Sequence, residues 1–229
     1  MGKLALDIID AAQDLHLHAS LNSTSDLAET IGADLIFDVT NLEVSKRVVE
    51  FAISKNINVL VGTSGWTKAA LVEVENKMSS GSAVVLIPNF SIGSTLATKF
   101  AAEAGKYFDS IEIIETHHAG KVDSPSGTAI RTAELISESR LTAGKNQPLI
   151  PGVGQTARGE VVSGIPIHSL RVDGVSAKQE VVLGGTAEVL TLSHEASSVQ
   201  AYALGILHAI KFTATAHGVV VGLDKVLGI

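Results

Sequence analysis

Apolar positions along the first ninety residues alternate between two spacings. Segments with one apolar helical face are separated by short runs that are apolar throughout or that alternate with period two. This pattern predicts helices at 3–13, 44–55 and 68–80 and strands at 15–21, 35–39, 58–61 and 83–87. Strands that alternate with helices are typical of βα units, which build a parallel sheet through right-handed crossovers.

After residue 90 the strands begin to follow one another. The spacing predicts strands at 111–116, 164–172, 178–183 and 188–194 and helices at 94–108, 127–140 and 197–212. Gly184 and Gly185 predict a turn, and the glycines and prolines of 142–159 predict a long loop. Strands in series indicate a mixed or antiparallel sheet.

The two patterns together predict an α/β fold with two domains. Residues 1–89 should form a Rossmann-like, doubly wound parallel sheet that 199–229 rejoin, and residues 90–198 a mixed-sheet α+β domain. The chain goes directly from Met1-Gly2 into a helix, so the central first strand of a doubly wound sheet is absent. Removing that strand would expose sheet edges and apolar surface, and we therefore expect the true start codon to lie upstream.

Composition excludes several classes of protein. The 229 residues are 45% hydrophobic, which excludes bulk disorder, and no apolar run approaches the roughly 18 residues of a membrane-spanning helix. There is no cysteine, which excludes disulfides and thiol chemistry, and Asp7 and Asp10 are unlike a signal peptide, so we expect a cytoplasmic protein. A net charge of −7 argues against nucleic acid as a partner and requires any site for an anion to be locally positive.

The segment 115–129 concentrates the residues that carry chemistry. His117 and His118 leave a predicted strand, Lys121 follows, and Ser126 and Thr128 stand at the start of a helix. The free N–H groups of a helix start, with a lysine beside them, bind carboxylate or phosphate, and histidine exchanges protons near neutral pH.

Each part of this segment is common by itself. A histidine pair is usually solvated or half-buried, and a Ser-Gly-Thr sequence usually caps a helix. Adjacent strand residues point to opposite faces, so the sequence predicts no metal site. The combination within fifteen residues favours an anion site with proton donors.

These residues also carry a family resemblance. The pattern E-x-H-H-x-x-K-x-D-x-P-S-G-T-A of 115–129 resembles the signature of the 4-hydroxy-tetrahydrodipicolinate reductase (dihydrodipicolinate reductase) family. Residues 61–65 (VGTSG) and 87–93 (IPNFSIG) are similar to the family's two cofactor segments, and Arg158-Gly159, 164–171 and 179–181 to its substrate domain. The resemblance covers essentially the whole chain.

The resemblance implies reduction of a cyclic imine dicarboxylate by NADH or NADPH in lysine and diaminopimelate biosynthesis, in a homotetramer. It makes His117 the acid/base, Lys121 the proton donor and partner of the substrate, and His118, Ser126, Gly127 and Thr128 the groups that hold substrate carboxylates. It assigns the cofactor to Gly62, Thr63, Ser64, Ile87, Pro88, Asn89 and Phe90. Closure between the domains would bring the histidine and lysine against the cofactor.

Departures from the family pattern keep alternatives open. Asn22 stands where the family has a charged residue at the adenosine ribose, which leaves both NADH and NADPH possible, and Val199 replaces an arginine. A cofactor-impaired, non-catalytic remnant that retains the oligomeric substrate domain is one alternative, and a Rossmann-type oxidoreductase for another dicarboxylate is a second. Residues 152–157 read G-x-G-x-x-A but follow Pro151, so we interpret them as a loop, and His168 and His194 as structural.

Overall fold

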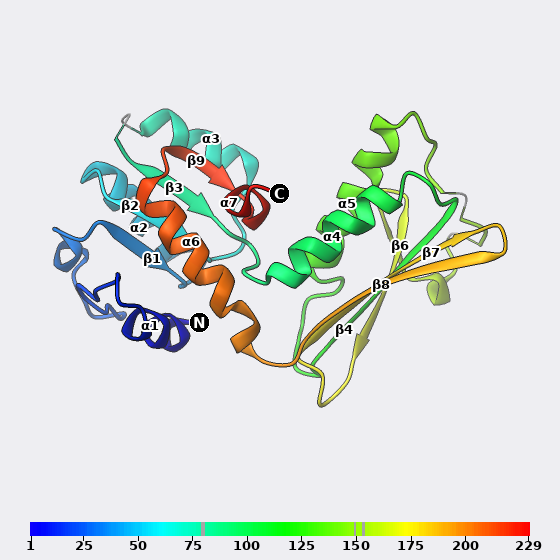
Figure 1. The fold of residues 1–229 in the computed structure, drawn as a ribbon, viewed down its shortest axis with the longest axis horizontal. Coiled ribbons are helices and arrows are strands. Elements are labelled where there is room, and N and C mark those ends of the chain that lie inside the picture. Colours follow the sequence, from blue (N-terminus) through cyan, green and yellow to red (C-terminus); the bar gives the residue numbers. More distant parts are fainter. Residues whose placement is uncertain (79–80, 149, 153) are drawn as a thin grey trace. The chain divides into compact units, whose positions relative to one another are not determined.

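A computed structural model describes residues 1–78, 81–148, 150–152 and 154–229. The chain forms two compact units (Figure 1). Unit 1 comprises Met1–Ile92 and Val199–Ile229, and unit 2 comprises Gly93–Ser198. No helix in the part of the chain that the structure describes is long and apolar enough to cross a membrane.

Unit 1 is built on a parallel sheet of four strands, in the order β1-β2-β3-β9. Its strands are β1 (Leu35–Asp38), β2 (Asn58–Val61), β3 (Ala83–Leu86) and β9 (Gly218–Val221). Its helices are α1 (Gly2–Ala11), α2 (Leu42–Ser54), α3 (Lys68–Lys77), α6 (Ala203–Thr215) and α7 (Leu223–Leu227), with short 3-10 turns at Leu27–Thr30 and Val199–Tyr202.

Helices cover both faces of this sheet, because alternate strand residues enter two separate cores. On one face, Leu60 and Val85 pack with residues of α1 and α6, including Ile206. On the other, Val59 and Val84 pack with residues of α2 and α3. Because both faces of each strand are buried, successive residues along these strands are mostly apolar. The predicted Rossmann-like architecture is confirmed.

Some predicted elements of unit 1 are wrong or incomplete. Residues 15–21 alternate as a strand would, yet they form no strand: β1 is an edge of the described sheet, and residues 15–21 do not pair with it. The fourth strand β9 and helix α7 were not predicted. The closing helix begins at Ala203, after a 3-10 turn, and positions 79–80 of the predicted helix at 68–80 lie outside the described residues.

Unit 2 contains a mixed sheet of five strands, in the order β5-β6-β4-β7-β8. Among the described strands of this sheet, β4 and β6 pair in parallel, and the other neighbours pair antiparallel. The strands are β4 (Ser110–His117), β5 (Glu160–Val162), β6 (Ile165–Arg171), β7 (Ala177–Gly185) and β8 (Glu188–Ala196). The helices are α4 (Ile92–Ala104) and α5 (Gly127–Thr142), and a 3-10 turn lies at Thr156–Arg158. The predicted mixed sheet is confirmed.

The hairpin between β7 and β8 turns later than predicted. Gly184 and Gly185 lie inside β7 and pair with β8, so the turn falls on Thr186 and Ala187. Ala187 has a φ of +60°, which a two-residue hairpin turn requires. The predicted helix at 94–108 ends at Ala104, and positions 149 and 153 of the predicted loop lie outside the described residues.

The two faces of the sheet in unit 2 differ in their covering. Ile113, Ile167 and Val181 lie on one face and pack with residues of α4 and α5. The strand register places Val161, Leu170 and Val189 on the other face, and these three side chains are exposed. We call this second surface the open face.

Candidate active site

The apolar face of β4 ends in two polar side chains. Successive strand residues point to opposite faces, so Ile111, Ile113, Glu115 and His117 share the face that packs under α5. The first three are buried, and Glu115 has no exposed surface. The side chain of His117 is 17% exposed, because the strand ends there and the chain turns into the loop before α5.

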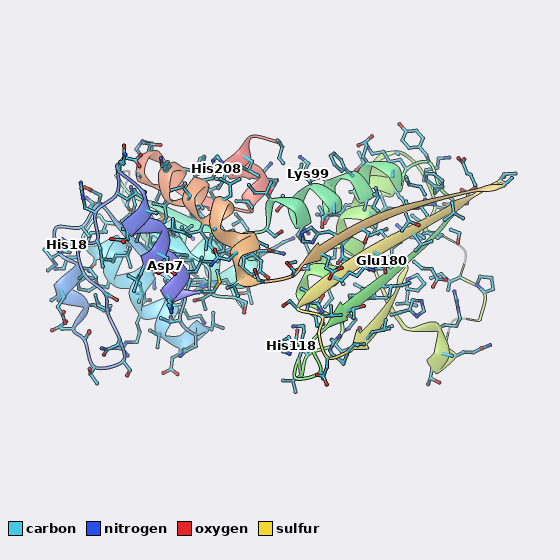
Figure 2. The ribbon with its side chains drawn as sticks, turned by 60° about the horizontal axis from the view of Figure 1, so that its bottom comes forward. Asp7, His18, Lys99, His118, Glu180 and His208 are labelled. Atoms are coloured by element: carbon cyan, nitrogen blue, oxygen red, sulfur yellow. The ribbon has the colours of Figure 1, made fainter. Side chains whose placement is uncertain are left out.

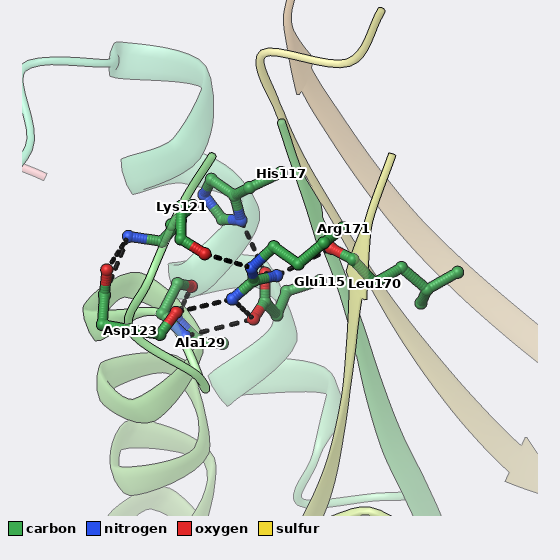
Figure 3. Close-up of polar contacts among 8 residues, drawn as sticks. Glu115, His117, Lys121, Asp123, Ala129, Leu170 and Arg171 are labelled. Carbon is green, nitrogen blue, oxygen red and sulfur yellow. Dashed lines mark hydrogen bonds and ion pairs between the residues drawn. The ribbon is translucent and has the colours of Figure 1, made fainter. Parts of the chain in front are cut away.

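Glu115 accepts hydrogen bonds from three directions (Figure 3). Arg171, on the neighbouring strand β6, makes a two-pronged contact of 3.0 Å, with one of its N–H groups to each carboxylate oxygen. The backbone N–H of Ser126 donates to Oε1 at 3.2 Å, and Nδ1 of His117 lies 2.5 Å from Oε2. A buried carboxylate is therefore fully paired at the base of the site.

The charge state of Glu115 follows from these contacts. Burial favours the neutral acid, but hydrogen bonds from Arg171, Ser169 and His117 outweigh it and hold the pKa of Glu115 below its ordinary value. An ionised carboxylate only accepts hydrogen bonds, so Nδ1 of His117 carries the proton of their contact. Nε2 of His117 has no hydrogen-bond partner among the described residues and is left for proton exchange.

Acid should weaken unit 2 through this group. Since folding lowers the pKa of Glu115, its stabilising contribution is complete above the ordinary value of about 4.5 and is lost as the pH falls through the lower folded-state value. We expect Glu115→Gln to cost about 3 kcal/mol of unfolding free energy at pH 7. Urea unfolding at several pH values should show that the unfolding free energies of the parent and of Glu115→Gln become equal in acid. Glu103→Gln, which changes an exposed ion pair, should differ from the parent by the same amount at every pH. A constant gap between parent and Glu115→Gln would contradict this expectation.

Lys121 is held in the loop between β4 and α5. Its backbone N–H donates to the carbonyl of His118 at 3.0 Å, and its own carbonyl accepts from Nε of Arg171 at 3.2 Å. Its Nζ contacts both carboxylate oxygens of Asp123, at 2.7 and 2.8 Å, and this hydrogen bond lowers the pKa of Asp123. The ammonium group is thus already positioned to pair with a carboxylate.

The start of α5 completes the site. Ser126 is buried, and its hydroxyl caps the helix by accepting from the N–H of Ala129 at 3.2 Å. Gly127 is exposed, and a Cβ added there would have no atom within 4 Å, so the first turn opens onto free space. Thr128 follows in the same turn and is partly exposed. The first turn of a helix, with its N–H groups and the positive end of the helix dipole, favours an anion.

His118 lies apart from the hydrogen-bonded cluster. It is exposed in the loop after β4, and its Nδ1 would lie 3.4 Å from a Cβ added at Gly120, so the ring borders the backbone of that glycine. Figure 2 shows His118 at the loop end of the sheet, away from Glu180 on β7. It stands within the same loop as Lys121.

The predicted cofactor residues gather at one edge of unit 1. Gly62, Thr63 and Ser64 follow β2, and residues 87–90 follow β3, which is hydrogen-bonded to β2 in parallel. The carboxyl ends of parallel strands therefore place both segments side by side, where open α/β sheets bind nucleotides. Ser64 and Pro88 are exposed, Asn89 is partly exposed, and Thr63, Ile87 and Phe90 are buried. The position of the two segments, at the carboxyl ends of neighbouring parallel strands, fits a bound nucleotide.

Close packing fixes these two segments to each other. A Cβ on Gly62 would lie 2.8 Å from the ring of Phe90, so any other residue there would force the ring to shift. The ring of Phe90 packs edge-on against Phe37, with centroids 5.6 Å apart. Thr63 donates to Oδ2 of buried Asp38 at 2.8 Å, which ties the β2 loop to the end of β1.

Thr63→Val should loosen this edge of the sheet. It keeps the shape of the side chain but removes the hydrogen bond to Asp38, and the uncompensated buried oxygen should cost about 1–3 kcal/mol. Urea unfolding measures the loss. Thr24→Val, which removes an exposed hydroxyl bonded to Asn22, is the matched control. Equal stability of the two variants would show that the contact between Thr63 and Asp38 does not stabilise the fold.

Sequence reasoning assigned no role to two residues of the cluster. Glu115 and Arg171 occur within the quoted motifs, but they lie 56 residues apart, and only the pairing of β4 with β6 joins them. The position of Glu115, two residues before His117 on a strand, indicates a shared face. No group of His, Cys, Asp or Glu in the described ranges could hold a metal ion.

A nucleotide-type parallel sheet and a mixed-sheet unit with a histidine–lysine centre together define a class of NAD(P)-dependent oxidoreductases. Two family models match the chain, "Dihydrodipicolinate reductase, N-terminus" over residues 1–90 and "Dihydrodipicolinate reductase, C-terminus" over residues 93–227. The chain belongs to the dihydrodipicolinate reductase family.

Individual relatives agree with the family models. The chain is similar to 4-hydroxy-tetrahydrodipicolinate reductase of Clavibacter sepedonicus, with 52% identity over 99% of this chain and 82% of the relative. The reductase of Streptomyces griseus subsp. griseus is 38% identical, over 99% and 93%. Among solved structures, a dipicolinate-bound dihydrodipicolinate reductase from Paenisporosarcina sp. TG-14 has a TM-score of 0.79 and 29% identity, over 98% and 94%. Nothing in these comparisons favours a non-catalytic remnant.

Proposed function

We propose that this chain reduces 4-hydroxy-tetrahydrodipicolinate to tetrahydrodipicolinate with NADH or NADPH, a step of lysine and diaminopimelate biosynthesis. The observation that carries the proposal is the arrangement of His117 and Lys121 beside the open first turn of α5. A family relative that binds dipicolinate, a planar ring with two carboxylates, supports a dicarboxylate as the class of substrate.

The residues of unit 2 bind the substrate and supply the proton. One ring carboxylate pairs with Nζ of Lys121 and with the N–H groups of Gly127 and Thr128, where helix start and ammonium both favour an anion. His118 and Ser126 border the same loop and turn and complete the proposed substrate site. The Nε2 atom of His117 exchanges the proton that the reduction consumes, with Lys121 as the donor beside it.

The residues of unit 1 hold the nicotinamide nucleotide. Bound NADH or NADPH supplies the hydride. Gly62, Thr63 and Ser64 present backbone after β2, and the segment from Ile87 through Pro88 and Asn89 to Phe90 lies beside them after β3. The balance is loss of the 4-hydroxyl group as water, together with a proton from an adjacent ring carbon, and addition of one hydride and one proton to the ring.

Steady-state turnover tests this proposal. The full chain, given 4-hydroxy-tetrahydrodipicolinate with NADH or with NADPH, should oxidise the cofactor only when the dicarboxylate is present. A cyclic imine with one carboxylate is the control substrate, and we expect it to lose at least tenfold in kcat/KM because one charge-assisted contact is missing. Equal turnover of the two substrates would contradict the dicarboxylate site, and no turnover with either cofactor would overturn the proposal.

We further propose a cytoplasmic homotetramer. The open face of unit 2 exposes Val161, Leu170 and Val189 on a sheet whose other face is already covered, and such a surface suits a second copy of the chain. Light scattering should give four chains per particle, and Val189→Asp should lower that mass. A monomeric parent at micromolar concentration would overturn the assembly.

A further inference from the structure

Two residues beneath the proposed proton donors take no part in the proposed reaction. Glu115 is buried, and Arg171 reaches it from the neighbouring strand β6. We propose that both are positioning residues: Glu115 fixes the proton of His117 on Nδ1, and Arg171 holds that carboxylate and the backbone of the loop. The proposal rests on the proposed function, because it describes how the same site is prepared.

The groups that contact the carboxylate of Glu115 are hydrogen-bond donors, so each of them needs an acceptor. Two N–H groups of Arg171, the backbone N–H of Ser126 and Nδ1 of His117 all point at its two oxygens. A carboxylate satisfies all four, whereas a glutamine offers one oxygen and turns an NH₂ group towards the remaining donors. The site is therefore built for the ionised carboxylate, and the lowered pKa of Glu115 agrees with that reading.

This contact decides which nitrogen of His117 exchanges protons. The tautomer of a neutral imidazole is set by the hydrogen bond that its other nitrogen makes. With Nδ1–H donated to Glu115 at 2.5 Å, the lone pair sits on Nε2, which has no partner in the described part of the chain. Without the carboxylate, the imidazole of His117 can carry its proton on Nε2 and can rotate. Proton transfer from Nε2 is then impaired although the histidine is still present.

Arg171 links this carboxylate to the loop of Lys121. Besides its two contacts to Glu115, it donates from Nε to the carbonyl of Lys121 at 3.2 Å and from Nη2 to the carbonyl of Asp123 at 2.6 Å (Figure 3). One planar guanidinium thus sets the positions of His117 and Lys121 together. A lysine at this position keeps the charge but cannot bridge these acceptors.

A second cluster of the same composition lies on the open face of β4. Glu112 pairs there with Arg158 and with Nε2 of His168. It lacks a helix start and a lysine loop, and its side chains are about a quarter to a third exposed. Glu112→Gln removes the same charge from the same strand, and it is therefore the matched control for Glu115→Gln.

Nitrogen-15 NMR of histidine-labelled full-length protein, without substrate or cofactor, reads the proton position directly. In the parent, Nδ1 of His117 should be protonated and Nε2 not, and Glu115→Gln should shift the population towards the opposite tautomer, whereas Glu112→Gln should not. A parent with the proton on Nε2 would overturn the proposal, whether or not the chain is a reductase.

Kinetics gives the second readout. Glu115→Gln and Arg171→Lys should each lower kcat about 10- to 100-fold, and Glu112→Gln should keep the parental kcat. KM for the dicarboxylate should stay within about threefold of the parent in Glu115→Gln and should rise in Arg171→Lys, which also releases the loop of Lys121. The mass of each variant is measured so that equal assemblies are compared. If Glu115→Gln does not fold, Arg171→Lys decides by the same tautomer and kcat measurements. Parental kcat and tautomer in both variants would contradict the positioning roles.

Discussion

Lys121→Ala should lower kcat for the dicarboxylate by about 10²- to 10⁴-fold, the usual range for removing a positioned proton donor. The substitution also removes the ammonium group that now contacts Asp123 at 2.7 and 2.8 Å and that would pair with a ring carboxylate. KM should therefore rise as well. His117→Ala should give a similar fall in kcat with a smaller change in KM, because His117 exchanges the proton but is not the main anion partner.

Lys178→Ala is the matched control for this result. Lys178 lies on β7 and pairs with Glu180 at 3.1 Å, on the face of the sheet away from α5. It loses the same charge from the same unit without touching the proposed site. If Lys121→Ala retained the turnover of Lys178→Ala, the assignment of the proton donor would be wrong.

Gly205→Ala should destabilise unit 1 and disturb its nucleotide edge. A Cβ at this position of α6 would lie 1.9 Å from the carbonyl oxygen of Phe90, which is backbone and cannot swing aside. Overpacking of this kind costs about 3 kcal/mol, while the gain in helix propensity from Gly to Ala is about 1 kcal/mol. The steric cost prevails, and we expect a net loss of about 2 kcal/mol and a Tm lower by about 4–8 °C.

The same substitution should weaken NADH and NADPH binding, because Phe90 belongs to the segment after β3. Gly2→Ala is the control, since a Cβ at Gly2 meets no atom within 4 Å and α1 begins there. Calorimetry measures both melting and nucleotide affinity. If Gly205→Ala had the same melting temperature as Gly2→Ala, the close contact between α6 and the backbone of Phe90 would be wrong.

The spacing of apolar residues predicted those helices and strands that the local sequence pattern is enough to specify. The strand expected at 58–61 coincides with β2, because Val59, Leu60 and Val61 form a short apolar run that is buried on both sides of the sheet. Residues 15–21 alternate with period two but form no strand, since a strand also needs a pairing partner, which periodicity does not identify. β9 is a short valine run of the same kind as β2, and its composition could have indicated a strand.

The candidate site likewise contains residues that the sequence alone brings together and contacts that depend on strand pairing. His117, Lys121 and the start of α5 lie within one short segment, so spacing alone brings them together. The contacts of Arg171 with Glu115 and with the carbonyl of Lys121 depend on the parallel register of β4 and β6. The hydrophobic pattern of each strand indicates which of its faces is buried, but β4 and β6 are far apart in the sequence, so no tight turn fixes their pairing.

Calorimetric titration of dipicolinate into the full chain tests the proposed dicarboxylate site most directly. One molecule should bind per chain, and Lys121→Ala should weaken its affinity at least tenfold while Lys178→Ala leaves it unchanged. Absence of binding to the parent, or equal binding to both variants, would contradict the placement of a doubly charged ring at the start of α5.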